Sequence, residues 1–142
     1  MPDGTDATLP TWGARFLRRL RSQRFRVADG SMAPTLLPGD CLYVDRGAYR
    51  ESPPARGDVV VVRDPEVPRR FLVKRVTFVP GQPPLPDAPR VPPRSVYVLG
   101  DNLAESRDSR KFGAVPLELV VGRVWFRYAP AGRRGSVTVT FK

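Results

Sequence analysis

Seven short apolar segments occupy the chain from residue 24 onward, and they limit its possible fold more than any other feature. They are rich in Val, Phe and Tyr, and clusters of Gly, Pro and Asp separate them; they lie at 24–28, 41–45, 58–63, 70–79, 95–99, 119–128 and 136–141. β-Branched and aromatic residues favour strands, and Gly, Pro and Asp end them. No strong helix signal follows residue 26, so the sequence predicts a mainly β fold, a small folded sheet or barrel.

The segment before these strands has a helical spacing of apolar residues. Apolar side chains fall on one face and arginines on the others: Trp12, Phe16, Leu17 and Leu20 against Arg15, Arg18, Arg19 and Arg21. The pattern predicts a short basic amphipathic helix. The favoured interpretation is a helix packed on its own domain, and the alternative is peripheral contact of residues 12–26 with an anionic membrane. We divide the chain into an N-terminal tail and helix, 1–23, and a β domain, 24–142.

The length of 142 residues suits one domain, and we expect a monomer. No run reaches the ~20 apolar residues that span a bilayer. Residues 1–30 also lack the apolar core of a secretory signal. The expectation is therefore a protein without a transmembrane helix or signal peptide, cytoplasmic or peripherally membrane-associated. The net charge of +10 favours acidic partners, although most of the arginines are scattered.

The chain contains no histidine and one cysteine, Cys41. This excludes Ser-His-Asp and Cys-His catalysis, an intrachain disulfide and a histidine- or cysteine-based zinc site. We expect no metal and no cofactor. A serine nucleophile in this chain would need a different base.

Ser31 opens a rigid bend, GSMAPTLLPGD (30–40), and such a bend can expose a nucleophilic hydroxyl. An ordinary turn is the alternative. Lysine is the natural base once histidine is absent, provided that an apolar environment lowers its pKa. Of the three lysines only Lys74 lies in an apolar strand, FLVKRVTFV, whereas Lys111 lies in a polar segment and Lys142 ends the chain. The alternative for Lys74 is an outward-facing position of that strand.

A polar segment at 99–116 supplies candidate partners for this lysine. It begins with a Gly-Asp-Asn turn and then places Ser106, Asp108 and Arg110 at alternate positions. Alternate residues of an extended segment point the same way. Ser106 could orient the lysine amine, and Asp108 could pair with Arg110. In isolation, the segment would be a polar surface loop.

Four motifs occur in order, GSMAPTL, GDVVVVRDP, FLVKRV and GDN…SRDSRKFG, and together they resemble the type I signal peptidase family of serine/lysine proteases. The resemblance covers roughly residues 27–127. It implies a signal-peptidase catalytic core and a serine endopeptidase that removes an N-terminal signal or leader peptide from a precursor protein. It further implies that Ser31 is the nucleophile, Lys74 the general base and Ser106 the lysine-orienting residue. Structural support of the site would come from Asp101, Asp108 and Arg110, and the substrate groove would be shaped by Met32 and Pro34.

Three features depart from the family pattern. Some members have a serine hydroxyl as a second oxyanion donor two residues before the nucleophile, where this chain has Asp29, so the backbone N–H of Ser31 is the expected donor. The proline-rich connection at 80–94 stands where other members insert a large cap domain, so none is expected. The membrane anchor of the family is not seen. In its small size and in the lack of a visible anchor, the sequence resembles one kind of member in particular, the nickel-type superoxide dismutase maturation protease.

Three other interpretations remain open. A LexA- or UmuD-type protein also uses serine and lysine, to cleave itself, but Ala28-Asp29-Gly30 is a poor internal site. A non-catalytic basic β module could bind nucleic acid through 125–128, although we expect no nucleic-acid partner. A catalytically inactive protein of the same fold is the third.

Overall fold

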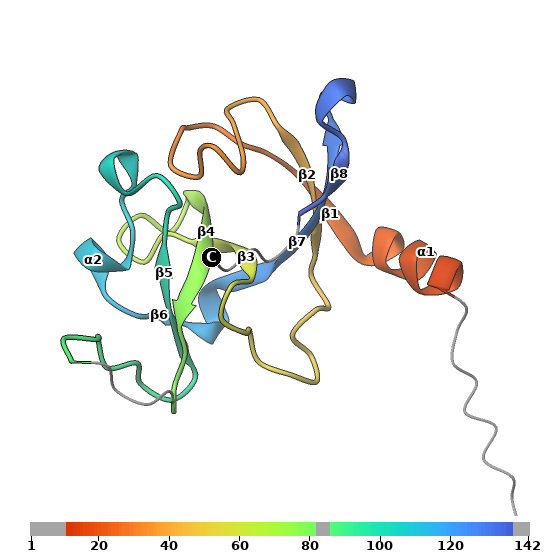
Figure 1. The fold of residues 1–142 in the computed structure, drawn as a ribbon. Coiled ribbons are helices and arrows are strands. Elements are labelled where there is room, and N and C mark those ends of the chain that lie inside the picture. Colours follow the sequence, from red (N-terminus) through yellow and green to blue (C-terminus); the bar gives the residue numbers. More distant parts are fainter. Residues whose placement is uncertain (1–10, 82–85, 138–142) are drawn as a thin grey trace, which may run out of the picture.

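A computed structural model describes residues 11–81 and 86–137, and within them the chain forms one curled antiparallel sheet (Figure 1). The helices are α1 (Thr11–Arg21) and α2 (Ser109–Phe112), and the 3₁₀ turns are η1 (Leu103–Glu105), η2 (Leu117–Leu119) and η3 (Ala131–Arg133). The strands are β1 (Ser22–Arg26), β2 (Cys41–Asp45), β3 (Val59–Arg63), β4 (Phe71–Phe78), β5 (Ser95–Leu99), β6 (Val115–Pro116), β7 (Val120–Ala129) and β8 (Gly135–Ser136).

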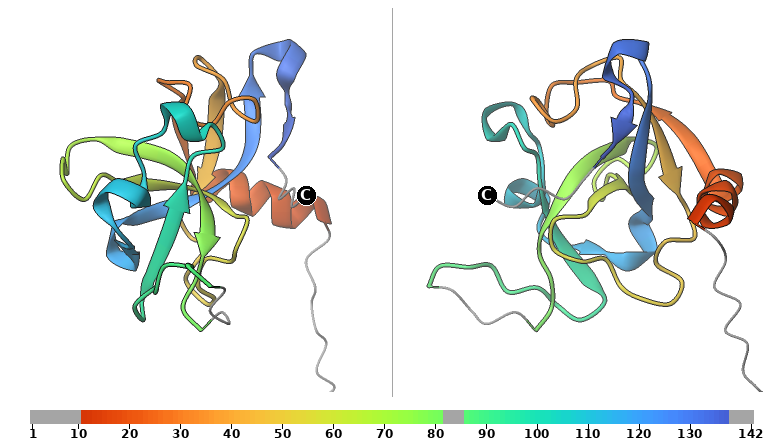
Figure 2. Two further views of the ribbon diagram at one scale, coloured as in Figure 1. Left: turned by 60° about the vertical axis from the view of Figure 1, so that its left-hand side comes forward. Right: turned by 45° about the vertical axis from the view of Figure 1, so that its right-hand side comes forward.

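The sheet runs in the order β1-β2-β7-β3-β4-β5-β6, and β8 pairs with β7. Register shifts interrupt the pairing of β2 with β7, of β3 with β7 and of β4 with β5. Such irregularities increase local twist and bend a strand. The sheet therefore curls into a half-barrel, which is seen almost end-on in the right-hand view of Figure 2. The predicted mainly β fold is confirmed.

The core has two clusters, one on each side of β3. Val59 and Val61 pack in the first cluster, whereas Val60 and Val62 pack in the second. All four are buried, because alternate residues of a strand face opposite sides of the sheet and here both sides are covered. A continuous run of valines is the sequence pattern of such a strand.

The predicted strand segments agree with the observed strands to within one or two residues, with one exception. The segment 136–141 contributes only the short strand β8, and 138–141 lie outside the described residues. The sequence has no strong helix signal after residue 26, and the one α-helix that the described residues form there, α2, has only four residues. The side chain of Asp108 accepts a hydrogen bond from the backbone N–H of Arg110 and caps this helix locally.

The predicted basic helix is present as α1, but the favoured interpretation, packing on its own domain, was wrong. Its apolar side chains are largely exposed: Trp12 74%, Phe16 59%, Leu17 43% and Leu20 68%. Polar contacts hold the helix instead. Arg21 pairs with Asp45 at 3.1 Å, and the guanidinium of Arg18 lies 5.3 Å from the ring centre of Trp125.

Among the described residues, no helix has the length and apolar character needed to cross a bilayer. The helix α1 ends at Arg21 and β1 begins at Ser22, close to the predicted boundary at residue 23. The division into two parts stays a prediction.

Candidate active site

A groove of about 260 Å³ brings Ser31 and Lys74 together. One wall is the segment 25–32, which runs from the end of β1 to the serine turn, and the other is 71–74 at the start of β4. The rings of Phe25 and Phe71 meet edge to face, 5.4 Å apart, and join the two walls. Both candidate catalytic side chains are buried, because Ser31 is 4% and Lys74 1% exposed.

Lys74 points inward from β4, so the alternative of an outward-facing strand position is wrong. Its neighbours Leu72 and Val76, on the same face of the strand, belong to a core cluster. Burial lowers the pKa of Lys74 below its ordinary value; the negative charges of Asp29 and Asp108 oppose this, whereas Arg107 and Arg110 reinforce it. A lysine with a lowered pKa has more of the neutral amine that a general base requires.

Ser106 and Asp108 fix the orientation of that amine. Lys74 Nζ donates to Ser106 Oγ at 3.1 Å, and Ser106 Oγ donates its own proton to Asp108 Oδ2 at 2.7 Å. Since the hydroxyl proton is committed to the carboxylate, Ser106 can only accept from the lysine. A neutral amine that donates to Ser106 keeps its lone pair for another group.

Asp108 is the anchor of this segment, and its side chain is fully buried. It accepts from the backbone N–H of Gly100 at 3.1 Å and from Arg110 Nε at 2.9 Å. Burial works against its ionisation, but these hydrogen bonds and the one from Ser106 hold the pKa of Asp108 below its ordinary value. The predicted pairing of Asp108 with Arg110 is present.

Two residues of the Gly-Asp-Asn turn hold the serine, and the sequence analysis assigned neither of them a role. The backbone N–H of Asn102 donates to Ser31 O at 2.9 Å, and its side-chain Nδ2 donates to Gly30 O at 3.1 Å. Gly100 packs so closely that a Cβ there would collide with Ser106 and with Ser31 O. The turn motif was the signal that could have identified both residues.

Asp101, predicted as structural support, joins three segments. It accepts from Arg75 Nε and Nη2, each at 2.8 Å, and from Thr35 Oγ1 at 2.6 Å. Arg75 also donates to Gly57 O at 2.8 Å. The arginine follows Lys74 directly on β4, so its bidentate bond ties the lysine strand to the turn that holds Ser31. Sequence reasoning missed Arg75 and Thr35.

A second unpredicted ion pair joins the segment that carries Ser106 to the residues just after β3. Arg107 binds the fully buried carboxylate of Asp64 through both of its terminal nitrogens and also reaches Glu66 at 3.3 Å. Asp64 lies just after β3, within the family-like GDVVVVRDP segment. This pair fixes the segment that carries Ser106.

The two predicted groove residues have different positions. Met32 is buried and lines the groove, whereas Pro34 is exposed and does not. Met32 Sδ also accepts from the backbone N–H of Asp101 at 3.5 Å. Among the described residues, no three His, Cys, Asp or Glu side chains gather as metal ligands would.

The expected oxyanion donor is already occupied. The backbone N–H of Ser31 donates to Asp29 Oδ1 at 3.0 Å, and its role as oxyanion donor stays a prediction. Asp29 accepts this bond because it lies two residues before Ser31 at a turn, the usual spacing of an Asx turn.

Fold and site together define a small β protein with a groove that is lined by a serine and by a buried, hydrogen-bonded lysine. A family model described as "Signal peptidase, peptidase S26" matches residues 8–83 and 82–129. The chain belongs to this family.

Three relatives illustrate the similarity. The chain is 43% identical over 111 residues to mitochondrial ATP-independent inner membrane protease subunit 1b of Arabidopsis thaliana, with 70% of this chain and 66% of that protein covered. It is 32% identical over 139 residues to signal peptidase I of Leptolyngbya laminosa, with 75% and 68% covered. It is 32% identical over 108 residues to mitochondrial inner membrane protease subunit 1 of Homo sapiens, with 70% and 65% covered. The matches thus span 65–68% of the length of these relatives.

This membership confirms the predicted resemblance to type I signal peptidases. It also confirms the predicted class of enzyme, a serine-type endopeptidase and therefore a hydrolase. The finer resemblance to the nickel-type superoxide dismutase maturation protease stays a prediction.

Proposed function

We propose that this protein removes an N-terminal signal or leader peptide from a precursor protein, with Ser31 as nucleophile and Lys74 as general base. The observation that carries the proposal is the buried amine of Lys74, held by Ser106 at 3.1 Å in the groove that also contains Ser31. Membership of the signal peptidase family supports a precursor as substrate.

The proposed proton transfers need only these two side chains and water. Neutral Lys74 takes the proton of the Ser31 hydroxyl while Oγ attacks the scissile carbonyl and forms a tetrahedral oxyanion. The lysine ammonium then gives its proton to the leaving amine, and an acyl-enzyme on Ser31 remains. Water, deprotonated by Lys74, hydrolyses this ester and returns both residues to their starting forms.

The groove suits an extended peptide. Within 11–81 and 86–137, residues 75–78 of β4 pair with β5, whereas 71–74 have no strand partner on that side, and 27–29 follow the end of β1. Both walls of the groove therefore offer backbone edges to which an extended chain can add by hydrogen bonding. We propose that the residues before the cleaved bond lie between these two edges.

The test is cleavage of a precursor that carries a small-x-small site, followed by mass spectrometry of the products. Ser31→Ala and Lys74→Ala should each reduce the rate by at least ~10³-fold, because nucleophile and base act together and the loss of either disables both. Lys74→Arg keeps a positive charge but supplies no base at neutral pH, so it should be equally inactive. Lys111→Ala is the matched control, since Lys111 is exposed on α2, and should cleave at the wild-type rate. Equal rates for wild type and Ser31→Ala would refute the proposal.

We further propose that α1 rests on an anionic membrane surface. Its exposed apolar residues lie beside Arg15 and Arg19, and this combination is typical of interfacial helices. Four arginines also line a pocket of about 370 Å³ next to the helix, together with Asp45 and Glu51: Arg18, Arg21, Arg50 and Arg123. The excess positive charge suits the phosphate of a lipid headgroup.

Sedimentation with vesicles tests this second proposal. We expect binding to phosphatidylglycerol-containing vesicles, weaker binding at high salt and little binding to pure phosphatidylcholine. The double variant Phe16→Ser/Leu20→Ser should lose binding and still cleave a soluble peptide. Arg69→Gln, a change of an exposed arginine in the turn before β4, should bind as wild type does. Equal binding of the double variant and the wild type would exclude α1 as the contact.

A further inference from the structure

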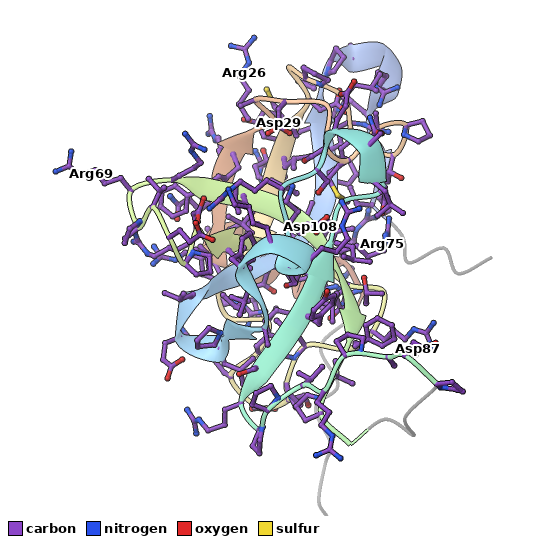
Figure 3. All side chains as sticks on the ribbon, turned by 90° about the vertical axis from the view of Figure 1, so that its left-hand side faces the viewer. Arg26, Asp29, Arg69, Arg75, Asp87 and Asp108 are labelled. Atoms are coloured by element: carbon purple, nitrogen blue, oxygen red, sulfur yellow. The ribbon has the colours of Figure 1, made fainter. Side chains whose placement is uncertain are left out.

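Asp29 has a position in the groove that the proposed reaction leaves unexplained. Its Oδ1 accepts the backbone N–H of Ser31 at 3.0 Å, while the residue itself is exposed and lines the groove. Figure 3 labels Asp29 near the upper end of this face and Asp108 near its middle. The carboxylate thus covers a donor of the nucleophile from the side on which a substrate would enter.

The covered donor is the one that the reaction requires. A tetrahedral intermediate on Ser31 Oγ carries a negative oxygen, and the N–H of the nucleophile is positioned to stabilise it. A carboxylate and an oxyanion cannot share one N–H, because both are negative and both only accept. The Asp29 side chain must therefore leave the Ser31 N–H before an oxyanion can form there.

The backbone around Ser31 is fixed, so the movable part is the Asp29 side chain. Asn102 binds Gly30 O at 3.1 Å and Ser31 O at 2.9 Å, which holds the turn from the opposite side. Asp29 is exposed, and rotation about its side-chain bonds moves the carboxylate without any change in this framework.

The same carboxylate acts on Lys74. Its negative charge raises the pKa of Lys74, as does that of Asp108, whereas burial and the charges of Arg107 and Arg110 lower it. In return, although burial opposes ionisation, hydrogen bonds from Ser31 and the positive charges of Lys74 and Arg70 hold the pKa of Asp29 below its ordinary value. While Asp29 lies over Ser31, its charge therefore offsets part of the lowering of the Lys74 pKa that burial causes.

We propose that the Asp29 carboxylate is a gate on the oxyanion donor, closed over the Ser31 N–H in the free protein and displaced when the scissile carbonyl enters the groove. The inference rests on the proposed function of Ser31 and Lys74. Displacement has two effects at once: the N–H becomes available to the oxyanion, and a negative charge moves away from Lys74. The protein would then be least reactive when no substrate fills the groove.

Two variants separate these effects in kinetics on a leader-bearing peptide. Asp29→Ala removes both the acceptor and the charge, so its kcat/KM should rise by roughly three- to tenfold, a fraction of what one oxyanion donor contributes, mainly through a lower KM, because substrate binding no longer has to displace the carboxylate. Asp29→Asn keeps an acceptor for the Ser31 N–H but removes the charge. It should show a smaller gain in kcat/KM and, like Asp29→Ala, move the acid limb of kcat/KM to lower pH. A lower kcat/KM for both variants would show that Asp29 assists the reaction and would overturn the gate.

A measurement without turnover keeps this test independent of the proposed function. The chain has three lysines, Lys74, Lys111 and Lys142, so lysine labelled with ¹³C at Cε gives few NMR signals, and Lys74→Ala assigns the relevant one. In Asp29→Asn the titration of Lys74 should move to lower pH while the other two stay in place. In Asp29→Ala the Ser31 amide should also shift as its acceptor disappears. Asp87→Asn, a change of an exposed carboxyl on the 80–94 loop, should change neither signal.

The two readouts distinguish the possible failures. If the Lys74 titration and the Ser31 amide do not respond to Asp29 substitution, the gate is wrong, whatever the enzyme cleaves. If both respond but the wild type cleaves no leader-bearing substrate, the proposed function fails and the gate fails with it as a device of catalysis.

Discussion

Figure 1 shows α1 at one side of the molecule, beyond β1 and β2, and the segment with η1 and α2 at the other. We call the surroundings of Lys74 and Ser106 the catalytic face and the surroundings of Arg18 and Arg21 the α1 surface. The two regions use arginine in different ways. On the catalytic face, Arg75 binds Asp101 and Arg107 binds Asp64 in pairs with little or partial exposure. On the α1 surface, Arg18 and Arg21 are nearly half exposed and share one buried carboxylate, Asp45. The first set of arginines holds segments of the fold together, whereas the second remains accessible to a partner.

The difference follows from solvation. A carboxylate taken out of water needs hydrogen bonds to stay ionised, so the buried Asp64 and Asp108 each have several donors, and loss of one is costly. An exposed guanidinium stays hydrated, so its ion pair contributes little to the free energy of unfolding. A high arginine content therefore serves rigidity on one side of this molecule and surface charge on the other.

Among the substitutions that distinguish the catalytic face from the α1 surface, Gly100→Ala should have the largest effect on stability and cleavage rate. The new Cβ would collide with Ser106 and with the carbonyl of Ser31, so both catalytic partners must shift. We expect roughly 1–3 kcal/mol less stability from the overpacking and about 10²-fold slower peptide cleavage from the displaced groups. Denaturant unfolding and cleavage kinetics measure the two quantities.

Gly132→Ala is the matched control for this change, because a Cβ at Gly132 meets no atom within 4 Å. It should be neutral in both assays. Wild-type activity in Gly100→Ala would mean that the close packing of Ser31 against Ser106 is not needed.

A pair of arginine substitutions compares the regions directly. Arg75→Met leaves Asp101 without its bidentate partner at a site where both side chains are under 20% exposed, and we expect a loss of roughly 1.5–3 kcal/mol in the free energy of unfolding. Arg21→Met should cost less than about 1 kcal/mol, because Arg21 is 46% exposed and Asp45 keeps its bond from Gly47 N–H. Similar losses for the two variants, measured by urea unfolding, would contradict the distinction.

Acid should weaken the catalytic face first. Burial opposes ionisation of Asp64 and Asp108, yet hydrogen bonds from Arg107 and Arg110 hold the pKa of each carboxyl below its ordinary value of 3.8. A carboxylate with a pKa lowered by folding contributes stability that is complete above its unfolded pKa and is lost as the pH falls below that value.

We therefore expect the contribution of these carboxylates to the free energy of unfolding to be level from about pH 7 to pH 5 and to fall steeply below about pH 4. Urea unfolding at a series of pH values measures this slope. Asp64→Asn, less stable at pH 7, should show a shallower acid slope, and Asp87→Asn should show the wild-type slope. An unchanged slope in Asp64→Asn would place the acid sensitivity elsewhere.

The smallest effect should come from the apolar face of α1. Phe16 is 59% exposed, so Phe16→Ser removes little buried area. The free energy of unfolding, measured through the shift of the thermal midpoint, should change by no more than about 0.5 kcal/mol. A large loss of stability would show that Phe16 packs against the protein after all. In that case the membrane proposal would lose its basis.

Much of the fold could be predicted from the sequence for a physical reason. Strands such as 41–45 and 95–99 match to the residue, because Val, Leu and Tyr favour strands and the flanking Gly, Pro and Asp end them locally. The candidate base also followed from composition: without histidine a base had to be found among three lysines, and one of these lay in an apolar strand. The role of Ser31 came from its bend and from the family resemblance.

The tertiary structure alone decided the contacts between segments distant in sequence. That Asn102 holds Ser31, that Arg75 binds Asp101 and that Arg107 binds Asp64 depends on how the sheet curls, and local patterns carry no information on this. The exposure of α1 could likewise not be predicted from the sequence. A helix with an apolar stripe has the same sequence pattern whether the stripe packs on the protein itself or on a membrane. The sequence determined which residues could do chemistry; folding decided which of them meet, because hydrogen bonds depend on distance and angle in space.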